Sequence, residues 1–502
     1  MKFHCDYKLK IIFLLIFLFI FSTGCSKTMS EDGGDYNIID TSTQTTHGDE
    51  DQISQTAPGE YSKEAYARYQ LDSPEIVELL KSKSSAIPLY EAAQLFFYLD
   101  DSFDYDNGTV WGIPLHAPIL FYDTETRELV ANRPDPDGIL EKLGGVYLGV
   151  LPDDLTIFDG VVSYSYLGGE RWIMVPWISV EGYDTAYNLR TLSHKAFHWH
   201  QPAFLGEYRG YNNSHMNEID ARKSIRMEIN ALIFALRMEE DARLAAIRDA
   251  LAIRAERRRA FGKETDENAF ELSEGLAQYV EISLELEREE SINDVQLNEF
   301  LRSMVDGMAK GDALEHGYGY LSGALYAFLL KEADSSWMQA VHGDSDLGVM
   351  LKDAVGITTL PPVDEIDLER YGYTLINVSE NEWATTREKM MEQIKDSLAS
   401  DPVLKFFFEH VVVDGATIQG QWFTFPDFGA VSRGNPQLIG NFGRLTVTNG
   451  DLILNEIEGA WMIVAHDIEF DEQRISGRNW LLELNDGYEV QHEGNAYIVK
   501  RT

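Results

Sequence analysis

Cysteine is nearly absent from this sequence. Its 502 residues include only Cys5 and Cys25, and no cysteine follows position 25. The main part of the chain therefore cannot form a disulfide, use a thiol nucleophile or bind a metal through thiolates. Any metal site in it must be built from histidine and carboxylate side chains.

Positive charge is also scarce. The chain has 42 Lys and Arg against 83 Asp and Glu, which gives a formal net charge of −41. A field of that sign repels nucleic acid, so we expect no DNA or RNA partner. The sequence also lacks a G-x-S-x-G elbow and a Gly-Lys-Ser/Thr phosphate loop, which argues against a serine hydrolase and a P-loop site.

The N-terminus has the pattern of a signal peptide. Three lysines within residues 1–10 precede an uncharged apolar run of 14 residues, IIFLLIFLFIFSTG. That run is shorter than the roughly 20 residues that span a membrane, but it suits a signal-peptide core. The spacing predicts a signal peptide over residues 1–24.

The end of this run, STGC, resembles the lipobox of bacterial lipoproteins, with Ser22 where leucine is usual. The resemblance implies that Cys25 becomes the acylated first residue of the mature chain, with palmitate-type chains that anchor it to a membrane. It also implies a cell-envelope location on the extracytoplasmic face of a bacterial membrane. Plain secretion with cleavage nearby is the alternative.

The rest of the chain divides by composition. Residues 25–60 are polar and acidic, typical of a disordered tether. Short β-branched and aromatic runs predict strands between about 111 and 180, and helical patterns fill about 184–333. A helical connector is expected over 361–400, with its helix over about 381–400. We predict an α+β protein: a small mixed sheet, a helical core and, over 401–502, a C-terminal all-β domain.

Local signals refine this division. Ser73 is expected to cap a helix that begins with Pro74. One long helix is expected over residues 217–261, with Gly262 just past its end. The arginines in its last turns would complement the negative end of the helix dipole, and an anion site is the alternative: Arg254, Arg257, Arg258 and Arg259. The tetrapeptides TNGD and HEGN fit hairpin turns.

The stretch LSHKAFHWHQ places His194 and His198 four residues apart on a predicted helix. Because a helix advances 100° per residue, the two imidazoles share one face, one turn apart, and can reach one zinc ion. Glu274, in ELSEGLAQY, is the candidate for a third ligand, since the neighbouring Gly275 would let that helix approach another backbone closely. Glu271, Glu274 and Gln278 also form a stripe typical of a solvated helix face.

These segments resemble a group of bacterial zinc peptidases of the gluzincin type. The motifs that carry the resemblance are LSHKAFHWHQ, EINALIFAL, ELSEGLAQYVE and GYGYLSGALYAFLL, and it spans roughly residues 110–340. The group has LxHExFHxxQ on one helix and EGxAxY on another about 75 residues later. The resemblance implies a zincin-like domain over 61–360, with zinc as cofactor and with His194, His198 and Glu274 as ligands.

The sequence departs from this group at Lys195, where the glutamate that serves as general base would stand. An ammonium group cannot take a proton from water, and at ~5 Å it would repel Zn²⁺ by about 6–7 kcal/mol at an effective dielectric of ~20. Glu271 is the candidate for a relocated base, and Glu271 or Glu218 for an ion-pair partner of Lys195. Tyr318 and Tyr320, with His316 nearby, are candidate donors to an oxyanion, although the glycine-rich EHGYGYLSG more simply begins a helix.

Three functions therefore compete. The first is a degenerate, membrane-anchored peptidase that binds a peptide or a protein partner, with the strand RWIMVPWI as a sheet edge that pairs with the peptide. The second is an active zinc peptidase with a relocated base. The third is a structural or binding lipoprotein without metal, in which the histidines only pack.

Overall fold

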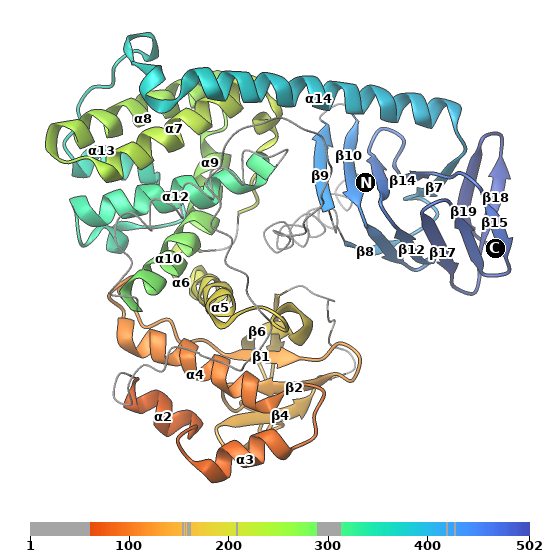
Figure 1. Cartoon of the computed structure of the whole chain (residues 1–502), viewed down its shortest axis with the longest axis horizontal. Helices are drawn as coiled ribbons and strands as arrows, with labels where there is room; N and C mark the ends of the chain where they lie inside the picture. Colours follow the sequence, from red (N-terminus) through yellow and green to blue (C-terminus); the bar gives the residue numbers. More distant parts are fainter. Residues whose placement is uncertain are drawn as a thin grey trace, which may run out of the picture.

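The computed structural model describes residues 61–152, 155, 157, 162–206, 209–288, 313–417, 420–425 and 428–502. It confirms an α+β protein with a small sheet first, a helical middle and a C-terminal region of two sheets (Figure 1). The predicted signal peptide, the lipidation of Cys25 and the tether all fall on residues outside the described part of the chain and stay predictions.

Three helices open the described chain: α2 (Lys63–Tyr69), α3 (Pro74–Ser82) and α4 (Leu89–Asp106). Ser73 caps α3 as predicted, because its hydroxyl accepts a hydrogen bond from the backbone amide of Ile76. Helix α4 buries most of its apolar residues against the first sheet and the helices that follow, within one continuous hydrophobic core.

The first sheet is mixed, with strand order β3-β4-β2-β1-β6-β5. Its strands are β1 (Ile119–Tyr122), β2 (Glu128–Ala131), β3 (Glu141–Leu143), β4 (Val146–Val150), β5 (Ser163–Leu167) and β6 (Glu170–Pro176). Strand β6, the RWIMVPWI segment, pairs in parallel with β1 and antiparallel with β5. The expectation that it forms a sheet edge is therefore wrong, and among the described strands β5 takes that place.

The helical middle follows, as predicted. Its helices are α5 (Thr185–His200), α6 (Pro202–Leu205), α7 (Ile219–Arg237), α8 (Glu240–Phe261), α9 (Glu264–Phe270), α10 (Leu276–Arg288), α12 (Ala313–Ala333) and α13 (Leu347–Ala354). The segment EHGYGYLSG lies in the first turns of α12, near the described start of the helix, as expected.

The long helix predicted over residues 217–261 is in fact a helical hairpin, with α7 and α8 packed side by side (Figure 1). The side chain of Arg243 donates hydrogen bonds to the carbonyls of Ala235 and Met238, at 3.2 and 2.7 Å, and so satisfies the end of α7. Helix α8 does end at Gly262, which adopts φ 64° as a left-handed cap.

The arginines near the end of α8 lie where they complement the helix dipole, and three of them also form a buried ion-pair network, which the sequence did not predict. Arg257 bonds to Glu228 and Glu267, and Arg258 to Glu267 and Asp346. We call the following seven residues the arginine network: Glu228, Arg254, Arg257, Arg258, Glu267, Glu271 and Asp346. Arg259 points outward, with 73% of its side chain exposed, and pairs with Glu256.

Helix α14 (Tyr373–Ser400) links the helical middle to the C-terminal region and begins eight residues before the predicted start of the connector helix (Figure 1). At its first half, Glu380 bonds to Arg222 and Arg226 on α7. At its second half, Met390 and Ile394 pack on the C-terminal strands. The helix is therefore fixed at both ends.

The C-terminal region is a β-sandwich, which confirms the all-β expectation. One sheet has the order β18-β19-β7-β14-β13-β10-β9 and the other β15-β16-β17-β12-β11-β8, with a shared apolar core. The strands are β7 (Val403–Phe407), β8 (Val413–Thr417), β9 (Gly420–Phe425), β10 (Gly429–Gly434), β11 (Gln437–Gly440), β12 (Gly443–Val447), β13 (Gly450–Asn455), β14 (Ala460–Val464), β15 (Glu469–Asp471), β16 (Arg474–Gly477), β17 (Trp480–Leu484), β18 (Tyr488–Glu493) and β19 (Ala496–Arg501).

The two predicted hairpin turns have different outcomes. HEGN joins β18 to β19 as an antiparallel hairpin, as predicted. TNGD joins β12 to β13, but these strands belong to different sheets, so the turn carries the chain across the sandwich instead of closing a hairpin. A turn motif specifies the local reversal but not the partner of the strand that follows it.

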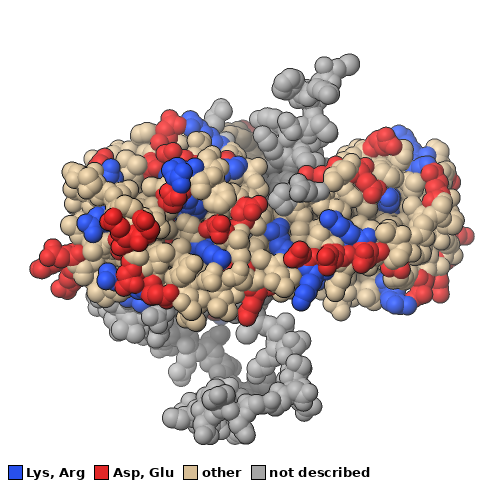
Figure 2. Space-filling view, turned by 90° about the horizontal axis from the view of Figure 1, so that it is seen from above, with Lys and Arg blue, Asp and Glu red and all other residues tan. Residues whose placement is uncertain are grey.

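The face seen from the α14 side shows acidic and basic side chains interspersed over both halves of the molecule (Figure 2). The excess of acidic groups is therefore not gathered on this face into one strongly charged patch. No helix in the described ranges is long and apolar enough to cross a membrane.

Candidate metal centre

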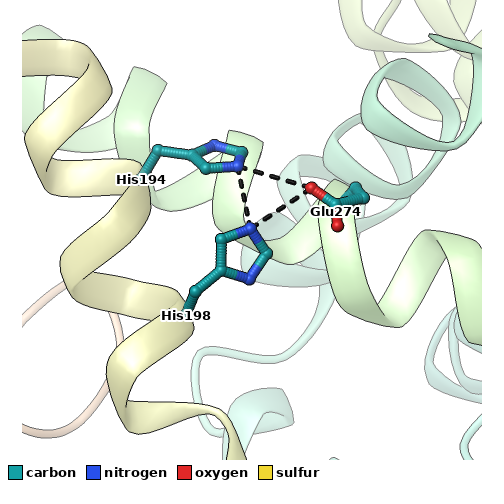
Figure 3. A group of neighbouring side chains, drawn as sticks. All are labelled: His194, His198 and Glu274. Carbon is teal, nitrogen blue, oxygen red and sulfur yellow. Dashed lines mark hydrogen bonds and ion pairs between the residues drawn. The ribbon is translucent and has the colours of Figure 1, made fainter. Parts of the chain in front are cut away.

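Helix α5 places the two histidines. Asp184 caps its start by accepting a hydrogen bond from the amide of Tyr187, at 2.7 Å. Leu192, Ala196 and Phe197 are fully buried and fix the rotation of the helix. His194 and His198 consequently face α10 and the segment before it, as the spacing predicted (Figure 3).

The structure brings His194, His198 and Glu274 together, and we call them the triad (Figure 3). The Nε2 atoms of the two histidines are 3.0 Å apart, and Glu274 Oε2 is 3.2 Å from His198 Nε2 and 3.5 Å from His194 Nε2. A tetrahedral zinc with bonds of about 2.0–2.1 Å has neighbouring ligand atoms roughly 3.3–3.4 Å apart. The three distances lie within about 0.4 Å of that spacing.

Each imidazole is held by a partner on its far nitrogen. His194 Nδ1 lies 3.1 Å from Glu281 Oε2, and His198 Nδ1 lies 2.6 Å from Gln201 Oε1. Both partner oxygens accept, so both Nδ1 atoms donate, and in a neutral ring the Nε2 atom then carries its lone pair toward the centre of the triad. Metal-binding histidines have partners of this kind, which orient the ring and raise its basicity.

Glu274 reaches the histidines from a π turn, η4 (Glu271–Gly275), which joins α9 to α10. The predicted role of Gly275 is confirmed: a Cβ atom there would lie 2.6 Å from the carbonyl oxygen of Gly319 and the Cα of Gly323 on α12. Glu271 and Gln278 are buried, so the solvated-face interpretation of this stripe is wrong.

The charge state of the triad suits a cation. Burial alone would raise the pKa of Glu274, but His198 and His194 hold it well below its ordinary range, so the carboxylate is ionised. Burial lowers the pKa of His198 against the opposing effect of Glu274, which favours the neutral imidazole. Imidazole nitrogens and a carboxylate oxygen are ligands that zinc prefers.

Lys195 is buried, with 5% of its surface exposed. Burial lowers the pKa of its amine, and the carboxylates of Glu274 and Glu281 act in the opposite direction. Within the described ranges no carboxylate lies within 4.0 Å of this amine, so the predicted ion pairs with Glu271 and Glu218 are wrong. The backbone carbonyl of Lys195 accepts a hydrogen bond of 3.0 Å from Tyr164 on β5.

Glu271 does not fit the role of relocated base. Its carboxylate is fully buried and accepts hydrogen bonds of 2.7 and 2.5 Å from Arg254, and another of 2.8 Å from Ser322. Both of its oxygens are therefore occupied by donors, and it faces the arginine network rather than the triad.

Of the predicted oxyanion donors, only Tyr320 lies beside the triad. The hydroxyl of Tyr318 donates to Asn213 in the core, at 3.0 Å, so the structure does not support it as a donor at the triad. His316 is partly buried, with its Nε2 atom 4.0 Å from Glu315. The ring of Tyr320 lies beside the triad and stacks on His194, with centroids 5.9 Å apart and an interplanar angle of 17°.

Sequence reasoning missed Glu281, Gln201 and the π turn. Gln201 stands three residues after His198, and Glu281 seven residues after Glu274, so both spacings carried a signal of a shared helix face. Comparison with known proteins adds nothing to this geometry: no protein family model matches the chain, and neither the curated proteins nor the solved structures contain a match.

Proposed function

We propose that this protein is a zinc-binding, metallopeptidase-like lipoprotein of the bacterial envelope that has lost the hydrolytic base and binds a peptide or protein segment without cleaving it. The convergence of three ligand atoms at distances of 3.0, 3.2 and 3.5 Å carries the proposal. The zincin-like assignment rests on the resemblance of the helix motifs, and the envelope location rests on the N-terminal residues.

The triad and its supports define which residues would hold zinc: His194, His198 and Glu274, with Glu281 and Gln201 behind the histidines. Bound zinc supplies a Lewis acid that accepts a carbonyl or carboxylate oxygen of a ligand. Three protein ligands leave a fourth position open for that oxygen.

Lys195 argues against hydrolysis. It occupies the position after the first histidine and it is buried, and among the described residues no carboxylate forms an ion pair with its amine. Binding without cleavage needs only the metal and a surface for the peptide backbone. Strand β5, at the described edge of the first sheet and bonded to the Lys195 carbonyl through Tyr164, offers such a surface for β-strand pairing.

Metal analysis of the purified protein tests the proposal. We expect one zinc per chain in wild type, its loss in His194→Ala, and no change in His200→Ala. His200 is the matched control, because it lies on the same helix but its Nε2 atom contacts the carbonyl of His116, at 3.1 Å. A wild-type protein that binds no zinc would overturn the metal site and leave a structural lipoprotein.

A peptidase assay on wild type and Lys195→Glu tests the missing base. We expect no cleavage by wild type and measurable zinc-dependent cleavage by the variant, since the glutamate restores a proton acceptor at the position where the resembling enzymes have one. Zinc-dependent cleavage by the wild-type protein would contradict the proposal that it is a binding protein only.

A further inference from the structure

The direction in which Glu274 points is set by the π turn that carries it. A π turn holds one residue more than an α turn, and such turns are rare and frequently occur at functional sites. Because one residue corresponds to about 100° of rotation, the phase of the helix changes between α9 and α10. The position of Glu274 therefore depends on whatever keeps the turn in this form.

Glu271, the first residue of the turn, is held by the arginine network. Arg254 binds both of its carboxylate oxygens, at 2.7 and 2.5 Å, and Ser322 on α12 donates to one of them at 2.8 Å. Arg254 is fixed in turn by Glu228, at 3.1 Å, and its guanidinium lies 4.8 Å from the centre of the Tyr326 ring.

The backbone of the turn is held from two further sides. A Cβ atom at Gly323 would lie 2.7 Å from the carbonyl oxygen of Glu271, so α12 packs directly on the turn. Gln201 donates from Nε2 to the carbonyls of Leu272 and Ser273, at 3.2 and 2.6 Å, while its Oε1 accepts from His198. One side chain thus links the turn to a histidine of the triad.

We infer that Glu271, locked by Arg254, is a positioning residue that keeps the π turn in place and so directs Glu274 toward His194 and His198. A buried ion pair adds little net stability compared with apolar residues, because desolvation offsets its attraction. A two-point guanidinium contact does fix the plane and direction of a carboxylate. This inference rests on the proposed zinc site.

Cobalt(II) binding, followed by its visible absorption spectrum, tests the inference on the full chain. Glu271→Gln and the milder Arg254→Lys should weaken binding at least ~10-fold, the lower end of what a lost outer-shell partner costs, and should change the spectrum because the carboxylate ligand moves. Glu380→Gln is the matched control: Glu380 is equally buried and bonds to Arg222 and Arg226, away from the turn.

The outcomes separate the two proposals. Wild-type affinity and spectrum in both variants would overturn the positioning role and leave the metal site intact. If wild type itself binds no metal, the proposed function fails, and amide hydrogen exchange over residues 271–276 of the metal-free protein decides the inference. Exchange at least ~10-fold faster in Glu271→Gln but not in Glu380→Gln supports it, and equal exchange overturns it.

Discussion

Two groups of buried polar side chains meet at the segment between α9 and α10. The arginine network surrounds its carboxylates with guanidinium donors, so almost every charge has an opposite partner within the protein. The triad brings two Nε2 lone pairs and a carboxylate oxygen together, and its donors all face outward, to Glu281 and Gln201.

The two clusters differ in whether their buried polar groups are paired within the protein. Buried polar groups cost free energy unless they are paired, so a complete network needs nothing from outside. A cluster made only of electron-pair donors becomes complete when a cation enters it.

Breaking the arginine network should have the largest effect on stability. Arg257→Met leaves the carboxylates of Glu228 and Glu267 buried without their shared partner, which should lower the free energy of unfolding by about 3–5 kcal/mol. Urea denaturation measures this loss. Arg259→Met, two residues along the same helix but exposed, should cost less than about 1 kcal/mol. Equal losses in the two variants would contradict the assignment of a buried network.

Zinc should stabilise the wild-type protein through the triad alone. At a free zinc concentration 100 times the dissociation constant, the free energy of unfolding should rise by about 2.7 kcal/mol. His194→Ala should remove this gain, whereas His200→Ala should retain it, as followed by thermal denaturation with and without a chelator. A zinc-dependent gain that survives in His194→Ala would place the cation elsewhere.

Glu281→Gln should weaken zinc binding by about 10–100-fold without abolishing it, because His194 keeps its ring but loses the anionic partner on Nδ1. Competition with a chromogenic chelator measures the change. Glu285→Gln is the matched control, since Glu285 lies one turn further along α10 and bonds to Arg190 at 2.9 Å. A similar loss in both variants would argue against a specific role for Glu281.

Acid should destabilise the protein through the arginine network, independently of zinc. Burial would raise the pKa of Asp346, but Arg254 and Arg258 hold it down to about 2, below its ordinary 3.8. Because the pKa of Asp346 is depressed in the folded state, its carboxylate adds about 2 kcal/mol to the free energy of unfolding above pH ~4. This contribution is lost as the pH falls toward 2. Urea denaturation at pH 5 and pH 2.5 should show this loss, and Asp346→Asn should reduce it. An unchanged pH dependence in that variant would contradict the linkage.

The sequence predicted the features that local patterns encode. These include the α+β class, the cap at Ser73, the end of α8 at Gly262, the shared face of His194 and His198, and the close approach at Gly275. Each follows from a residue type at a fixed spacing, so no knowledge of the tertiary partner was needed.

The features that were missed depend on tertiary partners. The break between α7 and α8 contains no glycine or proline, and the arginine network needs Glu228 from α7 to meet Arg254 and Arg257 on α8. Glu271 could be judged as a base only after Arg254 was seen to bind it. The π turn has no residue signature of its own, since packing against α12 determines whether one extra residue is accommodated.

Helix α14 has a mechanical consequence. With 28 residues at 1.5 Å each, it is a rod of roughly 42 Å, attached to α7 at one end and to the sandwich at the other. A rod held at both ends in this way sets a fixed spacing between α7 and the β-sandwich. Because α7 packs against α8, which bears Arg254, the helix that holds the β-sandwich and the network that holds Glu271 are parts of one continuously packed body.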